Sequence, residues 1–108
     1  MIEKYLFTLL SAIEKTYPVV MPQDVKMPAM RYLVVYDGTK QCLSGKVSGR
    51  DLRLQVDVFA DSYSEAKSLK EEVVTAIMSL NASNINAQDL YEKDTELHRQ
   101  RIDFTIKE

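Results

Sequence analysis

Few side chains in this sequence could carry out catalysis. The chain has one histidine, His98, and one cysteine, Cys42. Nucleophilic catalysis requires a nucleophile, a base and an orienting group close together. His98 is in phase with the apolar residues of a predicted strand, so we interpret it as a histidine at the edge of the core, and Cys42 as an incidental reduced thiol. The sequence therefore predicts no catalytic residues and no enzymatic activity.

Metal and cofactor sites have equally little support. A structural zinc site needs four ligands, mostly Cys and His, and this chain has one of each. Four nearby carboxylates could bind a divalent cation, but their spacing differs from that of a calcium-binding loop, and we interpret them as a solvated turn. They are Asp89, Glu92, Asp94 and Glu96. The glycines lack the spacing of a phosphate or dinucleotide loop, so the sequence predicts neither a metal nor a cofactor.

Length, composition and charge indicate one globular domain that spans residues 1–108. Hydrophobic residues make up 45% and charged residues 28% of the chain, which is typical of a folded domain. The net charge is −2, whereas a dedicated duplex-DNA binder has a strong basic excess. The lone cysteine, the absence of a secretion signal and the lack of an apolar run of ~20 residues predict a reducing compartment and no membrane contact.

Hydrophobic periodicity predicts two helices. In the first, apolar residues recur at three- and four-residue steps from Ile2 to Ile13, and the helix ends before Pro18. The second is capped by Asp61 or Ser62 and continues to Leu80; Ser62 has capping-box spacing with Glu65. A proline-containing extended connector follows the first helix.

Four segments have strand patterns. They lie at 30–36, 52–58, about 85–91 and 102–106. The second alternates strictly, so its polar positions, Arg53, Gln55 and Asp57, are expected to face solvent. The first is apolar on both faces and is therefore expected to be covered on both sides, by its own domain or by a partner. The order α-β-β-α-β-β predicts an α+β fold, an antiparallel four-stranded sheet with two helices packed on one face.

The segment 38–50 is predicted to be a long, flexible and locally basic loop. It holds all three glycines and no acidic residue. Its basic residues are Lys40, Lys46 and Arg50, and its strongly apolar ones are Leu43 and Val47. Loops of this length in compact domains are usually functional. We expect it to become ordered against a neighbouring subunit, a nucleic acid or an acidic partner.

Taken together, these features resemble the tail terminator, or minor tail completion, family of long-tailed bacteriophages and prophages. The resemblance spans nearly the whole chain. It is carried by the N-terminal helix, the Tyr17-Pro18 connector, the strand LRLQVDVFA (52–60), the helix opening DSYSEA (61–66) and the turn YEKDTELHR (91–99).

The resemblance implies a structural role without catalysis. Members of that family assemble as a ring, expected to be a hexamer, on the last ring of the tail tube, stop its polymerisation and present the surface that joins the head. The implied partners are other copies of the chain, the tail tube protein, head–tail connector proteins and, in passing, DNA. The implied location is the host cytoplasm during assembly and then the virion tail.

On this interpretation two groups of residues are the candidate sites. The predicted subunit contacts are Tyr32, Val34, Tyr36, Leu43 and Val47, and the basic residues predicted to face the lumen or a partner are Lys40, Lys46 and Arg50. One alternative is a phage neck or head-completion protein. A second is a small nucleic-acid-binding sheet, which has less support because the polar strand positions offer no aromatic platform for bases.

Overall fold

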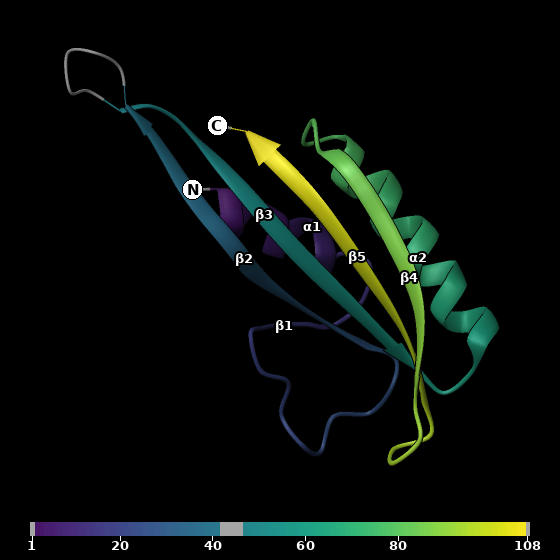
Figure 1. Ribbon diagram of the computed structural model, residues 1–108. Helices are drawn as coiled ribbons and strands as arrows, with labels where there is room; N and C mark the ends of the chain where they lie inside the picture. Colours follow the sequence, from purple (N-terminus) through teal and green to yellow (C-terminus); the bar gives the residue numbers. More distant parts are fainter. Residues whose placement is uncertain (1, 42–46, 108) are drawn as a thin grey trace.

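The computed structural model describes residues 2–41 and 47–107, with the backbone alone at 2, 39–41 and 47–50. Figure 1 shows the helices beside a long twisted sheet. The elements are α1 (Ile2–Ser11), β1 (Thr16–Pro18), β2 (Ala29–Gln41), β3 (Val47–Ala60), α2 (Tyr63–Met78), β4 (Ser83–Glu92) and β5 (Leu97–Lys107). The α+β class is confirmed, and so are both helices.

The sheet has five strands, in the order β1-β2-β3-β5-β4, rather than the four that were predicted. The additional strand, β1, runs parallel to β2 and pairs Thr16 with Met30, so the sheet is mixed and not purely antiparallel. Its three residues are too short a segment to show a periodic pattern, and the pairing arises because the chain returns along the edge of β2. The remaining neighbours are antiparallel, as predicted.

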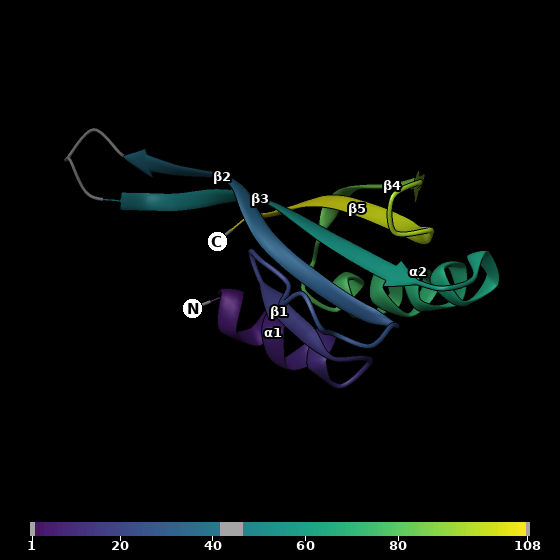
Figure 2. The same cartoon turned by 90° about the horizontal axis from the view of Figure 1, so that it is seen from below.

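Both helices lie on one face of the sheet, as predicted (Figure 2). The core between the two layers contains Leu6 and Leu10 from α1, Val73 and Ile77 from α2, and alternate residues of the strands. The largest fully buried side chain is Phe104. Burying an apolar side chain of this size stabilises a fold by roughly 1.5–3 kcal/mol, so these layers hold the sheet in place.

Of the two residues predicted to cap α2, Asp61 and Ser62, the N-cap is Ser62. Ser62 has extended backbone angles, and its side-chain oxygen accepts a hydrogen bond from the backbone N–H of Glu65 at 3.2 Å. This bond satisfies one of the N–H groups that have no partner within the helix.

The predicted loop at 38–50 is largely a β-hairpin, and the prediction is wrong in this respect. β2 continues to Gln41 and β3 begins at Val47, with Gly38 opposite Asp51 and Lys40 opposite Gly49. Backbone pairing across an antiparallel ladder satisfies N–H and C=O groups without requiring alternating apolar side chains. Hydrophobic periodicity therefore cannot detect it. The two strands project beyond the rest of the sheet (Figures 1 and 2) and are called the arm below.

A register shift in β2 separates residues that were predicted to share a face. Val34 pairs with Leu54, but Tyr36 pairs with Arg53, so Val35 is an additional residue in the ladder. Since the side-chain period of a strand is two, one additional residue moves everything after it to the opposite face. Tyr36 consequently lies on the face of Arg53, away from the helices.

The two tyrosines of β2 therefore have different surroundings. Tyr32 faces α1, and its ring centroid lies 6.0 Å from that of Phe7. The ring of Tyr36 lies over Gly38, where a Cβ added to the glycine would lie 2.7 Å from ring atoms. A glycine at 38 lets this exposed ring lie flat along the base of the arm.

Candidate functional site on the open face of the sheet

One face of the sheet is covered by the helices, and none of the described elements covers the other (Figure 2). We call this second surface the open face. It presents the strand residues that alternate with the buried core. Those used below are Arg31, Arg53, Gln55, Asp57, Phe59, Gln88, Arg99, Arg101, Asp103 and Thr105. Four of the five arginines of the chain lie on this face.

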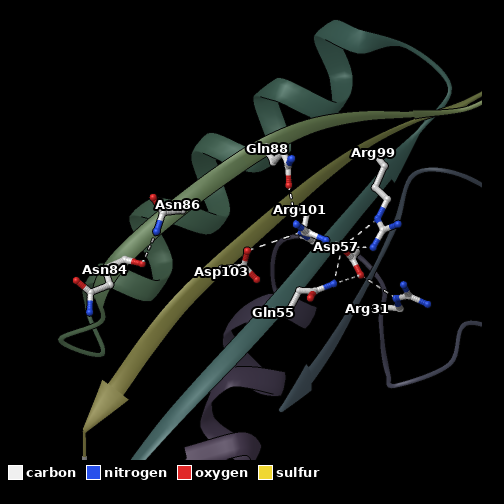
Figure 3. A network of polar contacts seen from close by, with 9 residues as sticks. All are labelled: Arg31, Gln55, Asp57, Asn84, Asn86, Gln88, Arg99, Arg101 and Asp103. Carbon is white, nitrogen blue, oxygen red and sulfur yellow. Dashed lines mark hydrogen bonds and ion pairs between the residues drawn. The ribbon is translucent and has the colours of Figure 1, made fainter. Parts of the chain in front are cut away.

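Asp57 lies at the centre of the open face and is completely buried, contrary to the predicted solvent exposure. Arg31 donates from Nε to Oδ2 at 2.9 Å, and Arg99 donates from Nε and Nη2 to Oδ1 at 3.1 and 3.0 Å. Gln55 Nε2 also donates to both carboxylate oxygens, at 3.2 and 3.0 Å. Figure 3 shows these three side chains converging on the carboxylate.

The register explains this burial. Arg31 lies directly opposite Asp57 on β2, and Arg99 reaches it from β5 on the other side. Both guanidinium groups also lie against Phe59, with Cζ 5.7 Å (Arg31) and 5.5 Å (Arg99) from the ring centroid, which is a cation–π geometry. The two guanidinium groups thus contact both the carboxylate and the aromatic ring.

This arrangement holds two arginines in fixed positions and leaves them with a surplus of positive charge. One carboxylate faces two guanidinium groups, whose side chains remain 29% (Arg31) and 18% (Arg99) exposed. Buried ion pairs contribute little net stability, but removing one partner costs about 3–5 kcal/mol. The main consequence of Asp57 is therefore to orient the two guanidinium groups at the surface.

The polar network continues across β5 to β4. Arg101 donates from Nη2 to Gln88 Oε1 at 2.7 Å, and its Nε lies 3.7 Å from Asp103 Oδ2. Next to it, a register shift in β4 places Asn84 at φ 53°, and its backbone carbonyl accepts from Asn86 Nδ2 at 3.1 Å. All three contacts are drawn in Figure 3.

A hollow of about 450 Å³ opens between Arg53 and the shifted end of β4. The residues that line it are Arg53, Asn84, Asn86, Asp103, Phe104 and Thr105. Guanidinium, amide and carboxylate groups of this kind bind by directional hydrogen bonds. Among residues 2–41 and 47–107, no group of three or more His, Cys, Asp or Glu is arranged to hold a metal ion. The groups present can donate and accept hydrogen bonds with a polar partner.

A second polar cluster lies on the helix side, between β4 and α2. Asp89 accepts from Gln100 Nε2 at 2.7 Å, from the Tyr63 hydroxyl at 3.0 Å and from Lys67 Nζ at 3.3 Å. The hydrogen bonds from Gln100 and Tyr63 lower the pKa of Asp89, and the hydrogen bond to Asp89 raises the pKa of Lys67. The interpretation of Asp89 and Glu92 as part of a solvated turn is wrong, because both lie in β4.

His98 is partly buried at the edge of this cluster. Its ring centroid lies 5.9 Å from that of Tyr63 and 5.0 Å from that of Tyr91. This position agrees with the interpretation of His98 as a histidine at the edge of the core.

The structure does not bring the predicted contact residues together as one surface. Tyr32 and Val34 lie on the helix side, whereas Tyr36 lies on the open face. Lys40, Val47 and Arg50 belong to the arm, where the backbone alone is described, and Thr39 lies opposite Arg50. Leu43 and Lys46 lie outside the described residues.

The Asp57 cluster was missed by sequence reasoning. The only available signal was the alternation of arginine with acidic or amide residues at the polar positions of three strands, such as Arg53-Gln55-Asp57 and Arg99-Arg101-Asp103. That pattern is also typical of an ordinary solvated face. Strand order, which the pattern does not give, is what makes the charges converge.

Comparison with known families decides what kind of protein this is. The family model described as "Tail completion protein gp17" matches residues 6–107. The chain belongs to this tail completion family. The predicted resemblance is therefore confirmed, and the chain is a structural protein of a phage-type virion tail.

Comparison with solved structures agrees. The fold is similar to that of a chain in the structure described as "Virion of native gene transfer agent (GTA) particle", with a TM-score of 0.68 and 12% sequence identity. The match covers 94% of this chain and 90% of that one. At this identity the likeness concerns the fold alone. Comparison with curated protein sequences gives no match.

Neither helix in the described ranges is long and apolar enough to cross a bilayer.

Proposed function

We propose that this tail completion protein caps the tail tube by assembling as a ring, ends the polymerisation of the tube and forms the surface that joins the head. The observation that carries the proposal is the arm, a pair of strands that projects from a small two-layer domain in a family of virion tail proteins (Figure 1). The principal axes of the chain measure 52 × 25 × 24 Å. An element that extends so far from its own core is suited to contact a neighbouring subunit.

Apolar side chains at the base of the arm support contact with a neighbouring copy. Val34, Val35 and Tyr36 are consecutive and are 37%, 53% and 57% exposed. They do not form one patch, because Val34 lies on the helix side and Tyr36 on the open face, so a neighbour would contact the base of the arm from both sides. A neighbour that covered these residues would gain the hydrophobic stabilisation that the isolated chain lacks.

The outer edge of β2 offers a second kind of contact. β1 pairs with β2 only from Met30 to Tyr32, and no other described strand pairs with that edge beyond Tyr32. A free edge presents backbone N–H and C=O groups that can pair with another chain. The base of the arm thus combines backbone hydrogen-bonding groups with apolar side chains.

A ring requires a heterologous contact, in which one surface meets a different surface of the next copy. On this proposal the ring consists of six copies, seated on the tail tube protein and facing the head–tail connector proteins. On the same proposal, Lys40, Lys46 and Arg50 are assigned to the inner or mating face of the ring, where they meet exiting DNA or an acidic neighbouring surface. Replacing these three by Glu is expected to impair ring assembly or head joining, measured by particle yield and infectivity. Normal particles would contradict their assignment.

Solution mass tests the ring. Light scattering over a range of concentrations should show the mass rising from one chain of 12.4 kDa towards six times that value, and negative-stain images should show rings. Val35→Asp should weaken self-association about tenfold or more, because burying an unpaired carboxylate in an interface is unfavourable. Val20→Asp is the matched control, because Val20 is 72% exposed in the connector after β1. A constant monomer, or equal effects of the two variants, would refute the proposal.

The position in the virion distinguishes this role from that of a neck or head-completion protein. A tail terminator should be present in tails made without heads and absent from heads made without tails. The reverse distribution, measured by immunoblotting of purified tails and heads, would favour the alternative.

A further inference from the structure

We infer that the open face of the sheet binds the outer side of α2 of a second copy of this chain, with arginines of one copy meeting glutamates of the next. This inference rests on the proposed ring and specifies which two surfaces build it. It is carried by three observations. These are an uncovered sheet face with arginines at its centre, an acidic outer side on α2, and the location of the two surfaces on opposite sides of the molecule.

The open face is positively charged at its centre although the chain as a whole carries a net charge of −2. Arg31, Arg53, Arg99 and Arg101 lie there. The carboxylates on this face are Asp57, which is buried beneath two guanidinium groups, Asp103, and Asp51, which lies opposite Lys107 towards the arm. Asp57 holds the guanidinium groups in place before a partner arrives. An arginine that is already oriented loses less conformational entropy when it binds a carboxylate.

The outer side of α2 has the complementary charge. Its exposed residues include Glu65, Glu71 and Glu72. The two lysines of the helix, Lys67 and Lys70, have side chains that are 39% and 15% exposed, and they are paired with Asp89 and Glu71. Glu71 is paired with Lys70 at 2.6 Å, so Glu65 and Glu72 are the principal acidic groups. They are seven residues apart, which places them two turns apart on one side of the helix.

The remaining side chains on this side of α2 permit close approach to a sheet. Most of its other exposed positions are serine or threonine, and Met78 is 61% exposed near the C-terminal end. Small residues let a helix lie near a sheet surface, and the hollow beside Arg53 has room for a larger side chain such as Met78. A helix on the open face would complete a helix–sheet–helix sandwich, which is a stable layer arrangement.

The two surfaces lie on opposite sides of the molecule, so the contact is head to tail. Figure 2 shows α2 beneath the sheet and the open face above it. A contact between the front of one copy and the back of the next cannot be satisfied within a two-fold dimer. It therefore continues from copy to copy, and closes into a ring when the rotation between copies allows it.

Charge reversal with compensation tests the inference. Arg53→Glu changes an exposed arginine outside the Asp57 cluster, and Glu65→Lys with Glu72→Lys changes the partner surface. Each set alone should weaken self-association about tenfold, measured by sedimentation, because charge pairs across an interface contribute this much or more. Combining both sets in one chain should restore at least half of the lost association on a logarithmic scale. Lys93→Glu and Asp94→Lys, in the exposed turn after β4, are the controls.

Cysteine cross-linking gives an independent geometric test. In a Cys42→Ser background, Arg53→Cys and Glu72→Cys are prepared as separate proteins, mixed and oxidised. The inference requires cross-linked dimers in the mixture and few in either protein alone, and a ladder of cross-linked species when both cysteines are in one chain. Efficient cross-linking of either single variant with itself would indicate a two-fold contact and would overturn the inference.

The remaining outcomes separate this inference from the proposed ring. If Val35→Asp abolishes association while the charge-reversal variants associate like the unmodified protein, the ring stands and the open-face contact is wrong. A protein that is monomeric at all concentrations overturns both. If Arg53→Glu reduces binding to a short DNA duplex, measured by fluorescence anisotropy, and leaves self-association unchanged, the open face is a nucleic-acid surface and the inference is wrong.

Discussion

Replacing Asp57 by Asn should cost this protein a large part of its stability. The substitution keeps the shape of the side chain and removes its charge. One carboxylate oxygen becomes an NH₂ group, which then faces either the Nε of Arg31 or the Nε and Nη2 of Arg99, since these donate to different oxygens. A donor that faces a donor inside a buried site loses its hydrogen bond and leaves a guanidinium group without its counter-charge.

The magnitude follows from these contacts. Hydrogen bonds to charged groups contribute about 1.5–3 kcal/mol each, and breaking a buried ion pair costs about 3–5 kcal/mol. A conservative expectation is a loss of about 3 kcal/mol. With an unfolding entropy of ~2.1 cal/mol/K per residue, a chain of 108 residues would then lose roughly 13 °C in Tm.

Thermal unfolding by circular dichroism measures this loss, and urea titration checks that the transition stays cooperative. Asp103→Asn is the matched control, because Asp103 lies on the same face, is partly exposed and has a single long ion pair of 3.7 Å to Arg101. Such pairs contribute about 0–1 kcal/mol. If Asp57→Asn lowers Tm by no more than Asp103→Asn does, the carboxylate does not organise the open face and the reasoning above is refuted.

Two further predictions concern α2 and its contact with β4. Ser62→Ala should cost about 1 kcal/mol of stability, or roughly 4–5 °C in Tm, because the helix loses its N-cap. The control is Ser64→Ala, at an exposed position two residues later, which should change Tm by less than about 2 °C. Equal losses in the two variants would contradict the assignment of Ser62 as the cap. Gln100 and Tyr63 donate hydrogen bonds to Asp89 and lower its pKa in the folded state below its unfolded value. The Asp89 carboxylate therefore stabilises the folded protein above the unfolded pKa, and this stabilisation is lost as pH falls through the folded pKa. The Tm difference between the unmodified protein and Asp89→Asn should therefore be largest near neutral pH and should shrink below about pH 4, and a difference that grows towards acid pH would contradict this.

The helices could be predicted because their physical signal is local. Leu6 and Leu10 in α1 and Val73 and Ile77 in α2 repeat with the helical period and are buried. Tyr5, which belongs to the same predicted stripe of α1, is 68% exposed, so the period gave the core face but not its full width. Ser62 could be predicted for the same reason, since a cap depends on residues three positions apart. The alternation in β3 likewise gave the correct buried face, from Leu52 to Val58.

The features that could not be predicted depend on backbone pairing. β1 has three residues and owes its conformation to the neighbouring edge of β2. The arm pairs through its backbone, where glycine and polar side chains give no periodic pattern. The side to which Tyr36 points depends on one additional residue, Val35, in the ladder. A sequence pattern fixes which residues alternate, but it does not show where a ladder shifts by one.

The open face was predicted in part: the alternation of β3 gave the residues on it, but not the burial of Asp57 among them. Asp57 receives hydrogen bonds from β2 and from β5, the strands on both sides of β3. A shift of either neighbour by one residue would turn its arginine towards the apolar core and leave the carboxylate without that partner, which is a costly state. The same contacts that penalise a register error across three strands also hold two guanidinium groups at the surface. A polar residue at the centre of a sheet face can thus fix the pairing of the strands and prepare the surface that a second copy would meet.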